Sequence, residues 1–141
     1  MSSRESDLEQ VSCRIGGVSA IADAVAATEQ FGKAQWLERD ELARLCIIVE
    51  ELVANLYDHG GVTAADEIEL SFRNDPAGIA IVIVDPGNPF DPSDMSRTIE
   101  RTERGGAAGI DIVRAWAQFV SYDVTEAGNR LELLLPLHWS G

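Results

Sequence analysis

The chain has 141 residues, 45% of them hydrophobic, which fits one domain with a continuous core and is too short for two. Its 24 acidic and 11 basic side chains leave a formal net charge of -13, which opposes direct binding of nucleic acid. No apolar run reaches the roughly 20 residues of a membrane helix, and the first residues contain no signal-peptide core, so we expect a cytoplasmic protein without membrane contact.

Hydrophobic patterning predicts a two-layer α/β sandwich, with helices on one face of a largely antiparallel, mixed sheet. We expect residues 1–9 to form a flexible tail and residues 10–138 to form the single domain. The expected elements in chain order are a strand at 10–15, a helix from 18 to about 31, a helix at 40–58, strands at 67–73 and 79–84, a helix from about 110 to 117, and strands at 119–125 and 131–137.

The helix at 40–58 has the clearest pattern, because its apolar residues recur at three- and four-residue spacing and define one buried face. Gly60 and Gly61 are expected to end it. The nearly continuous β-branched run at 79–84 is typical of a buried strand, and turns are expected at 74–78 and 127–129. Residues 85–109 are predicted to be irregular apart from a short helical turn, and loops of this length are usually functional or disordered.

Three polar segments are candidates for chemistry, and the first lies on the helix at 40–58. Glu51 and Asn55 are four residues apart, so they project from the same helix face, with His59 one turn further on. The Asn oxygen could hold a hydrated magnesium ion while the Glu accepts a proton from an attacking hydroxyl. The same spacing also fits a solvated helix face.

The second segment, residues 85–92, follows the buried strand directly and has the sequence Asp-Pro-Gly-Asn-Pro-Phe-Asp-Pro. Asp85 at the end of a central strand is placed to accept a hydrogen bond from an exocyclic amine, and Gly87 lets the backbone approach a flat ring. This geometry would suit adenine. Asp-Pro-Gly is also an ordinary turn sequence.

The third segment is a glycine-rich stretch at 104–109 that opens into the next helix and so presents free N–H groups to an anion. It would suit phosphate, although such a stretch can equally be a hinge. It is not a P-loop, since no Gly-Lys-Ser/Thr follows, and it lacks the strand, Gly-x-Gly-x-x-Gly and helix of a dinucleotide fold.

In this order the three segments resemble the nucleotide site of the GHKL ATPase superfamily. Asn-Pro-Phe-Asp-Pro at 88–92 and the ending Gly-Asn-Arg-Leu-Glu-Leu-Leu-Leu-Pro at 128–136 are most similar to the anti-sigma-factor serine kinases within it. The resemblance covers nearly the whole chain and implies a histidine-kinase-like ATPase fold that binds ATP and Mg²⁺. Because the net charge of -13 opposes ATP, a nucleotide site here needs a divalent cation, backbone N–H groups and local cations.

The resemblance implies roles for the candidate residues. Glu51 would be the general base, Asn55 the magnesium ligand and Asp85 the acceptor for the adenine amine. His59 would lie near the nucleotide or cap the helix. The residues implied to line the adenine and the phosphates are Gly87, Gly105, Gly106 and Gly109, with Arg104 as the cation for the terminal phosphate.

The resemblance also implies partners. The phosphate acceptor would be a serine on a STAS-type anti-anti-sigma protein. A second surface would hold a sigma factor or another regulatory protein, often in a homodimer, and release it when the unphosphorylated antagonist competes.

Three alternatives stay open. In the first, the domain binds ATP only to shape a partner-binding surface and has no kinase activity; retained Glu51 argues against this, and Ala107, at the middle glycine of the family pattern, argues for it. In the second, the chain is the catalytic part of a histidine kinase acting on another chain, since His59 and His138 alone do not supply a phospho-accepting helix pair. In the third, the α/β domain binds no nucleotide.

Overall fold

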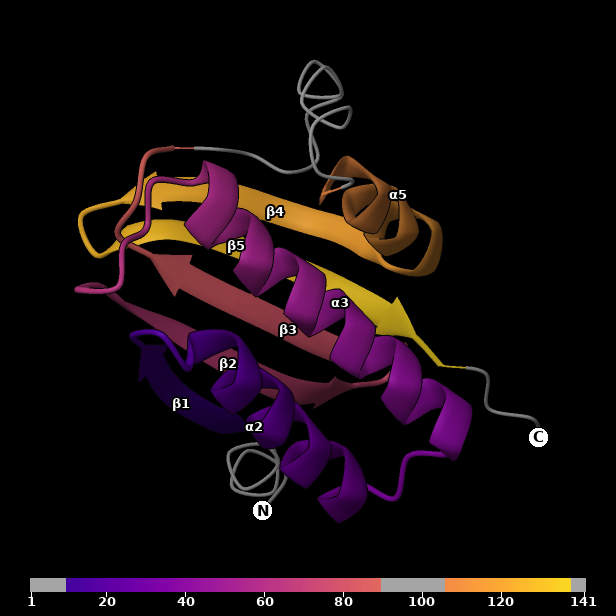
Figure 1. Ribbon diagram of the computed structural model, residues 1–141. Coiled ribbons are helices and arrows are strands. Elements are labelled where there is room, and N and C mark those ends of the chain that lie inside the picture. The colour runs from indigo at the N-terminus through magenta and orange to yellow at the C-terminus, as the bar shows by residue number, and fades with distance from the viewer. Residues whose placement is uncertain (1–9, 90–105, 138–141) are drawn as a thin grey trace.

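The computed structural model describes residues 10–89 and 106–137 (Figure 1). The expected flexible tail at 1–9 lies outside the described residues, as do the site candidates Arg104 and Gly105. The described elements follow in the order β1 (Val11–Gly16), α2 (Ala20–Ala34), α3 (Arg39–His59), β2 (Glu67–Asp75), β3 (Gly78–Asp85), α5 (Gly106–Trp116), β4 (Gln118–Thr125) and β5 (Gly128–Pro136).

The five described strands form one sheet in the order β1-β2-β3-β5-β4, and each of the four pairings is antiparallel. β3 is the central strand. Its isoleucine side chains are buried, and Val82 and Val84, which alternate with them, are half-buried. This confirms the buried strand predicted at 79–84, and it places Asp85 at the end of the middle strand.

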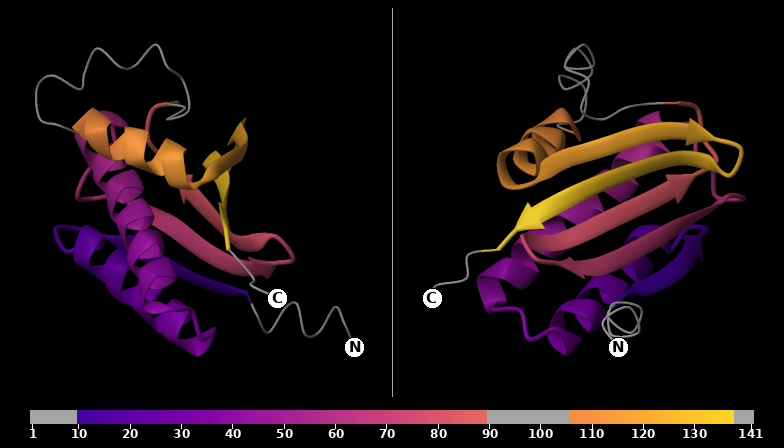
Figure 2. Two further views of the ribbon diagram at one scale, coloured as in Figure 1. Left: turned by 90° about the vertical axis from the view of Figure 1, so that its right-hand side faces the viewer. Right: turned by 180° about the vertical axis from the view of Figure 1, so that it is seen from behind.

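The described helices α2, α3 and α5 all cover one face of the sheet and leave the other face open (Figure 2). This confirms the predicted two-layer arrangement. α3 lies across the sheet, because its apolar face matches the inward-pointing side chains of the strands. The fully buried side chains beneath and around it include Leu45, Ile48, Val49, Val53, Ile68, Leu70, Phe72, Ile81 and Leu133.

Most element boundaries lie within a few residues of the predicted ones, and the largest difference is at the start of α5. α5 begins at Gly106 and not near residue 110, so Gly106 and Gly109 lie within the first turns of a helix. Glycine has low helix propensity, so the sequence favoured a loop here, whereas α5, which packs against α3 and buries Val113, extends back to Gly106.

Both hairpin turns are shorter than predicted, and the turn expected at 74–78 consists of Pro76 and Ala77 alone. We predicted a turn at 127–129, but the turn residues are Glu126 and Ala127, and β5 already begins at Gly128. Gly128 has φ +133°, and a Cβ atom there would lie 2.5 Å from the backbone oxygen of Asp85. A glycine therefore permits close pairing of β5 with the end of β3, where a side chain would clash.

None of the described helices is long and apolar enough to span a membrane.

Candidate functional site

The first predicted segment lies on the second half of α3. Asn55 is buried, with 8% of its surface exposed, whereas Glu51 and His59 are half-buried. The described residues form no hydrogen bond with the Asn55 side chain, and Asn55 borders a pocket. A buried amide without an internal partner is suited to bind a ligand or a metal ion.

The charge state of Glu51 depends on its surroundings. Partial burial raises the pKa of Glu51, and the carboxylates of Glu50 and Asp58 raise it further. A carboxylate whose pKa is shifted toward neutrality is better suited to accept a proton than an ordinary surface glutamate. Glu51 is not among the residues that line the pocket beside Asn55, and its role as general base stays a prediction.

Asp85 is the second predicted site residue and is 5% exposed at the end of β3. Its Oδ1 atom accepts hydrogen bonds from the backbone N–H of Gly87 at 2.8 Å and from the Asn129 amide at 3.2 Å. Burial raises the pKa of Asp85, and the hydrogen bonds from Gly87 and Asn129 lower it and partly offset the effect of burial. The described residues make no hydrogen bond to Oδ2, which leaves this atom as the acceptor for a ligand.

Asn55 and Asp85 border the same small pocket, which is otherwise mainly apolar. It lies between α3, the end of β3 and the last hairpin, and its lining is Leu52, Asn55, Leu56, Ile83, Asp85, Tyr122 and Leu131. Its volume is about 10 Å³, enough for one water molecule at most. A flat ligand could enter only if the lining moved outward, and it would then meet apolar walls with one buried carboxylate.

The turn after β3 is attached to the end of α3. The N–H of Asn88 donates to the carbonyl of Gly60, the C-terminal cap of α3, at 2.8 Å. A Cβ atom on Gly87 would lie 2.2 Å from that same carbonyl oxygen and 2.9 Å from Cγ2 of Val62. Gly87 is therefore required by the close approach of the turn to α3, a reason that the sequence did not reveal.

The third predicted segment is only partly described. Gly106 and Gly109 lie at the start of α5, whose packing against α3 brings the helix onto the same layer as Asn55. Free N–H groups at this helix start would still favour an anion, but they belong to a helix and not to the loop that we expected. Arg104 and Gly105 lie outside the described residues, so their roles stay predictions.

Two residues of the site were missed by sequence reasoning. Tyr122 of β4 borders the pocket, and Asn129 of β5 lies opposite Asp85 in the sheet register. Tyr122 packs on the core together with Phe119, three residues earlier, because the register of β4 shifts between Phe119 and Ser121, so strict alternation could not have indicated it. The position of Asn129 depends on strand pairing, which the sequence does not specify.

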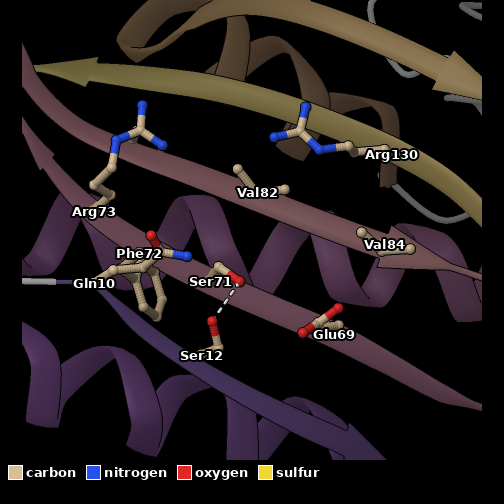
Figure 3. A pocket seen from close by; sticks show the side chains of 10 residues that line it. Gln10, Ser12, Glu69, Ser71, Phe72, Arg73, Val82, Val84 and Arg130 are labelled. Atoms are coloured by element: carbon tan, nitrogen blue, oxygen red, sulfur yellow. Dashed lines mark hydrogen bonds between the residues drawn. The ribbon is translucent and has the colours of Figure 1, made fainter. Parts of the chain in front are cut away.

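A larger hollow of about 240 Å³ lies on the open face of the sheet, away from the helices (Figure 3). It contains two arginines, Arg73 and Arg130, but both are paired with Glu132, at 3.6 Å and 3.2 Å. Glu69 adds a second carboxylate to this region. The hollow therefore has no excess positive charge for a phosphate, and the pocket beside Asp85 is the better nucleotide candidate.

Two polar groups border the pocket, and a third lies outside its lining on the same helix as Asn55. Asp85 can accept a hydrogen bond from an amine, Asn55 offers an amide oxygen to a hard cation, and Glu51 lies one helical turn before Asn55 as a proton acceptor. No cluster of three or more His, Cys, Asp or Glu that could hold a metal exists among the described residues. A magnesium ion here would therefore depend on ligand phosphates and water for most of its coordination.

The family model described as the histidine kinase-like ATPase domain matches residues 17–135, which include α3, the pocket and both hairpins. A search of curated proteins gave no match to this chain.

Proposed function

The chain belongs to the histidine kinase-like ATPase domain family, which indicates ATP binding, and we propose that it binds Mg-ATP in the pocket between Asn55 and Asp85. The observation that carries this proposal is the pocket itself. Two buried polar residues, from a helix and a strand 30 positions apart in sequence, border one apolar pocket. Oδ2 of Asp85 suits the amine of an adenine, and the amide oxygen of Asn55 suits a magnesium ion.

Binding would proceed from the groups that the structure places in the pocket. Oδ2 of Asp85 accepts the hydrogen bond of the adenine amine, and the leucine and isoleucine side chains of the lining contact the purine faces. The Asn55 oxygen would hold the magnesium ion, which supplies charge neutralisation on the phosphates when bound. Neutralisation is important because the chain's net charge of -13 repels a triphosphate.

We further propose that the protein is a serine kinase of the anti-sigma-factor type. Glu51 takes the proton of a serine hydroxyl on a STAS-type anti-anti-sigma protein as the serine oxygen bonds to the γ-phosphorus. The bond between that phosphorus and the bridging oxygen then breaks and leaves ADP. The raised pKa of Glu51 supports the base role, and the sequence motifs at 88–92 and 128–136 support this branch of the family.

In the same proposal the unphosphorylated antagonist competes for the protein and releases a bound sigma factor or similar regulator. The acidic composition of the chain, with 24 acidic against 11 basic side chains, suits a basic partner surface. A cytoplasmic location and a homodimer belong to this proposal as well.

A second candidate function is an ATP-dependent binding module without kinase activity. Two observations favour it. Gly106, Ala107 and Gly109 belong to α5, which restricts the backbone that would close over phosphates. Glu51 does not border the described pocket. In this case ATP would stabilise a surface that holds the partner without being consumed.

Transfer of labelled phosphate separates the two functions. The parent and the variant Glu51→Gln are incubated with γ-labelled ATP and a STAS-type anti-anti-sigma protein from the same organism. Kinase activity predicts labelled serine with the parent and a loss of roughly 100-fold or more with Glu51→Gln, in line with typical general-base contributions, at unchanged ATP affinity.

The matched control is Glu29→Gln, which removes an exposed glutamate on α2 that is not among the groups raising the pKa of Glu51. It is expected to keep labelling near the parent level. Equal labelling by Glu51→Gln and the parent would exclude Glu51 as the base, and ATP binding by the parent without any labelled serine would favour the binding module.

A further inference from the structure

Asn129 occupies a defined position next to the carboxylate of Asp85. The two residues are direct partners in the pairing of β3 with β5, and Asn129 is 4% exposed. Its amide nitrogen lies 3.2 Å from Oδ1 of Asp85, 2.9 Å from the carbonyl oxygen of Gly87 and 3.3 Å from that of Asn88. All three neighbours are acceptors, so the amide nitrogen and not the amide oxygen must face them.

These contacts determine which oxygen of Asp85 is available to a ligand. Oδ1 is occupied by two donors, the Asn129 amide and the N–H of Gly87 at 2.8 Å. Oδ2 receives no hydrogen bond from the described chain, and Asp85 borders the pocket. The carboxylate is therefore held by one oxygen and can offer the other to the pocket.

The same amide also connects three parts of the fold. By donating to the carbonyls of Gly87 and Asn88, Asn129 ties the turn after β3 to β5. The N–H of Asn88 in turn donates to Gly60 at the end of α3. Loss of the Asn129 amide would release the turn on one side, while its link to α3 would remain.

We propose that Asn129 is a positioning residue, which holds the Asp85 carboxylate with Oδ2 directed to the pocket and thereby sets the preference of the site for purines that carry a 6-amino group. This inference rests on the proposed binding of ATP. Asn129 does not line the described pocket, yet it would help to select the nucleobase that binds there. Without the amide, the carboxylate would have one fixed donor, Gly87, and could rotate away from the amine.

The test uses calorimetric titration in magnesium to compare the binding of two nucleotides by the parent and by two variants of Asn129 that are isosteric with each other. ATP and purine riboside triphosphate differ only in the 6-amino group, so the ratio of their affinities measures recognition of that amine. Asn129→Val and Asn129→Thr have nearly the same shape and differ by one hydroxyl donor. Thermal unfolding of each variant, followed by circular dichroism, establishes that the titrated protein is folded.

We expect the parent to bind ATP more tightly than purine riboside triphosphate by about 10-fold or more, the range of a hydrogen bond to a charged group. In Asn129→Val this ratio should fall to within about 3-fold of one. Asn129→Thr should recover part of the ratio, because its hydroxyl can donate to Oδ1 of Asp85.

The outcomes distinguish the two levels of the account. If the parent binds ATP and Asn129→Val weakens both nucleotides by the same factor, Asn129 only supports the fold and the positioning role is wrong, while the proposed function stands. Equal ratios in Asn129→Thr and Asn129→Val would also overturn it, because the donor would then have no effect. If the parent binds neither nucleotide, the proposed function fails and this inference fails with it.

Discussion

The substitution Asp85→Asn changes the proposed adenine acceptor with little change in shape. Oδ1 of Asp85 faces two donors, the N–H of Gly87 and the amide of Asn129. The carbonyl oxygen of an asparagine would therefore turn to that side and keep both hydrogen bonds. Its NH₂ group would take the place of Oδ2 and meet the adenine amine as one donor against another.

The magnitude follows from the bond that is lost. A hydrogen bond to a charged group contributes about 1.5–3 kcal/mol, so ATP affinity should fall by roughly 10- to 150-fold. Purine riboside triphosphate, which has no 6-amino group, should bind with nearly unchanged affinity. The assay is calorimetric titration of the parent and the variant with both nucleotides in magnesium.

The same variant also makes a prediction for stability. Because burial raises the pKa of Asp85 above its ordinary value, the folded state favours the protonated carboxyl. That contribution is present at low pH and is lost as the pH rises through the raised pKa. Above that raised pKa the ionised Asp85 is a cost to folding, and Asp85→Asn should be at least as stable as the parent there.

Asp123→Asn provides the matched control, because Asp123 is exposed on β4 and does not border the pocket. It should leave the affinity for both nucleotides unchanged. If Asp85→Asn binds ATP as tightly as the parent, Asp85 does not accept the adenine amine. If the variant weakens both nucleotides equally, the loss comes from altered structure and the reasoning about Oδ2 is wrong.

Two further substitutions test the magnesium ligand and the close packing of the turn. Asn55→Ala removes a buried amide that forms no hydrogen bond with the described residues, so the free energy of unfolding, measured by thermal denaturation, should change by less than about 1 kcal/mol. Calorimetry should show that the variant binds ATP with the same affinity in magnesium as in chelator. Continued magnesium dependence would exclude Asn55 as the ligand. Gly87→Ala places a Cβ atom 2.2 Å from the Gly60 carbonyl oxygen, so chemical denaturation should show that the free energy of unfolding falls by about 1–3 kcal/mol because of overpacking. A variant as stable as the parent would show that the turn does not pack tightly on α3.

The elements that the sequence predicted best are those in which one physical pattern dominates. The three- and four-residue spacing of leucine and valine predicted α3, and the β-branched run at 79–84 predicted the central strand, because burial alone determines both. The start of α5 was missed because its glycines have low helix propensity, which favoured a loop up to residue 109.

The candidate site was predictable in part. Asn55 and Asp85 were singled out by their motifs, and the structure places them at one pocket. The role of Asn129 could not be predicted, because it depends on the pairing of β5 with β3. The reason for Gly87 was also hidden, since the clash that excludes a side chain there involves Gly60, which lies 27 positions earlier in the sequence.

Magnesium-dependent nucleotide binding is the central claim, and calorimetric titration of the unmodified protein with a non-hydrolysable ATP analogue tests it most directly. The titration is performed once with magnesium and once with chelator. The account predicts saturable binding at one site in magnesium and much weaker binding in chelator, since the cation must offset repulsion by a chain of net charge -13. No binding at millimolar analogue in magnesium would contradict the account and would leave a domain of this fold that holds a partner without nucleotide.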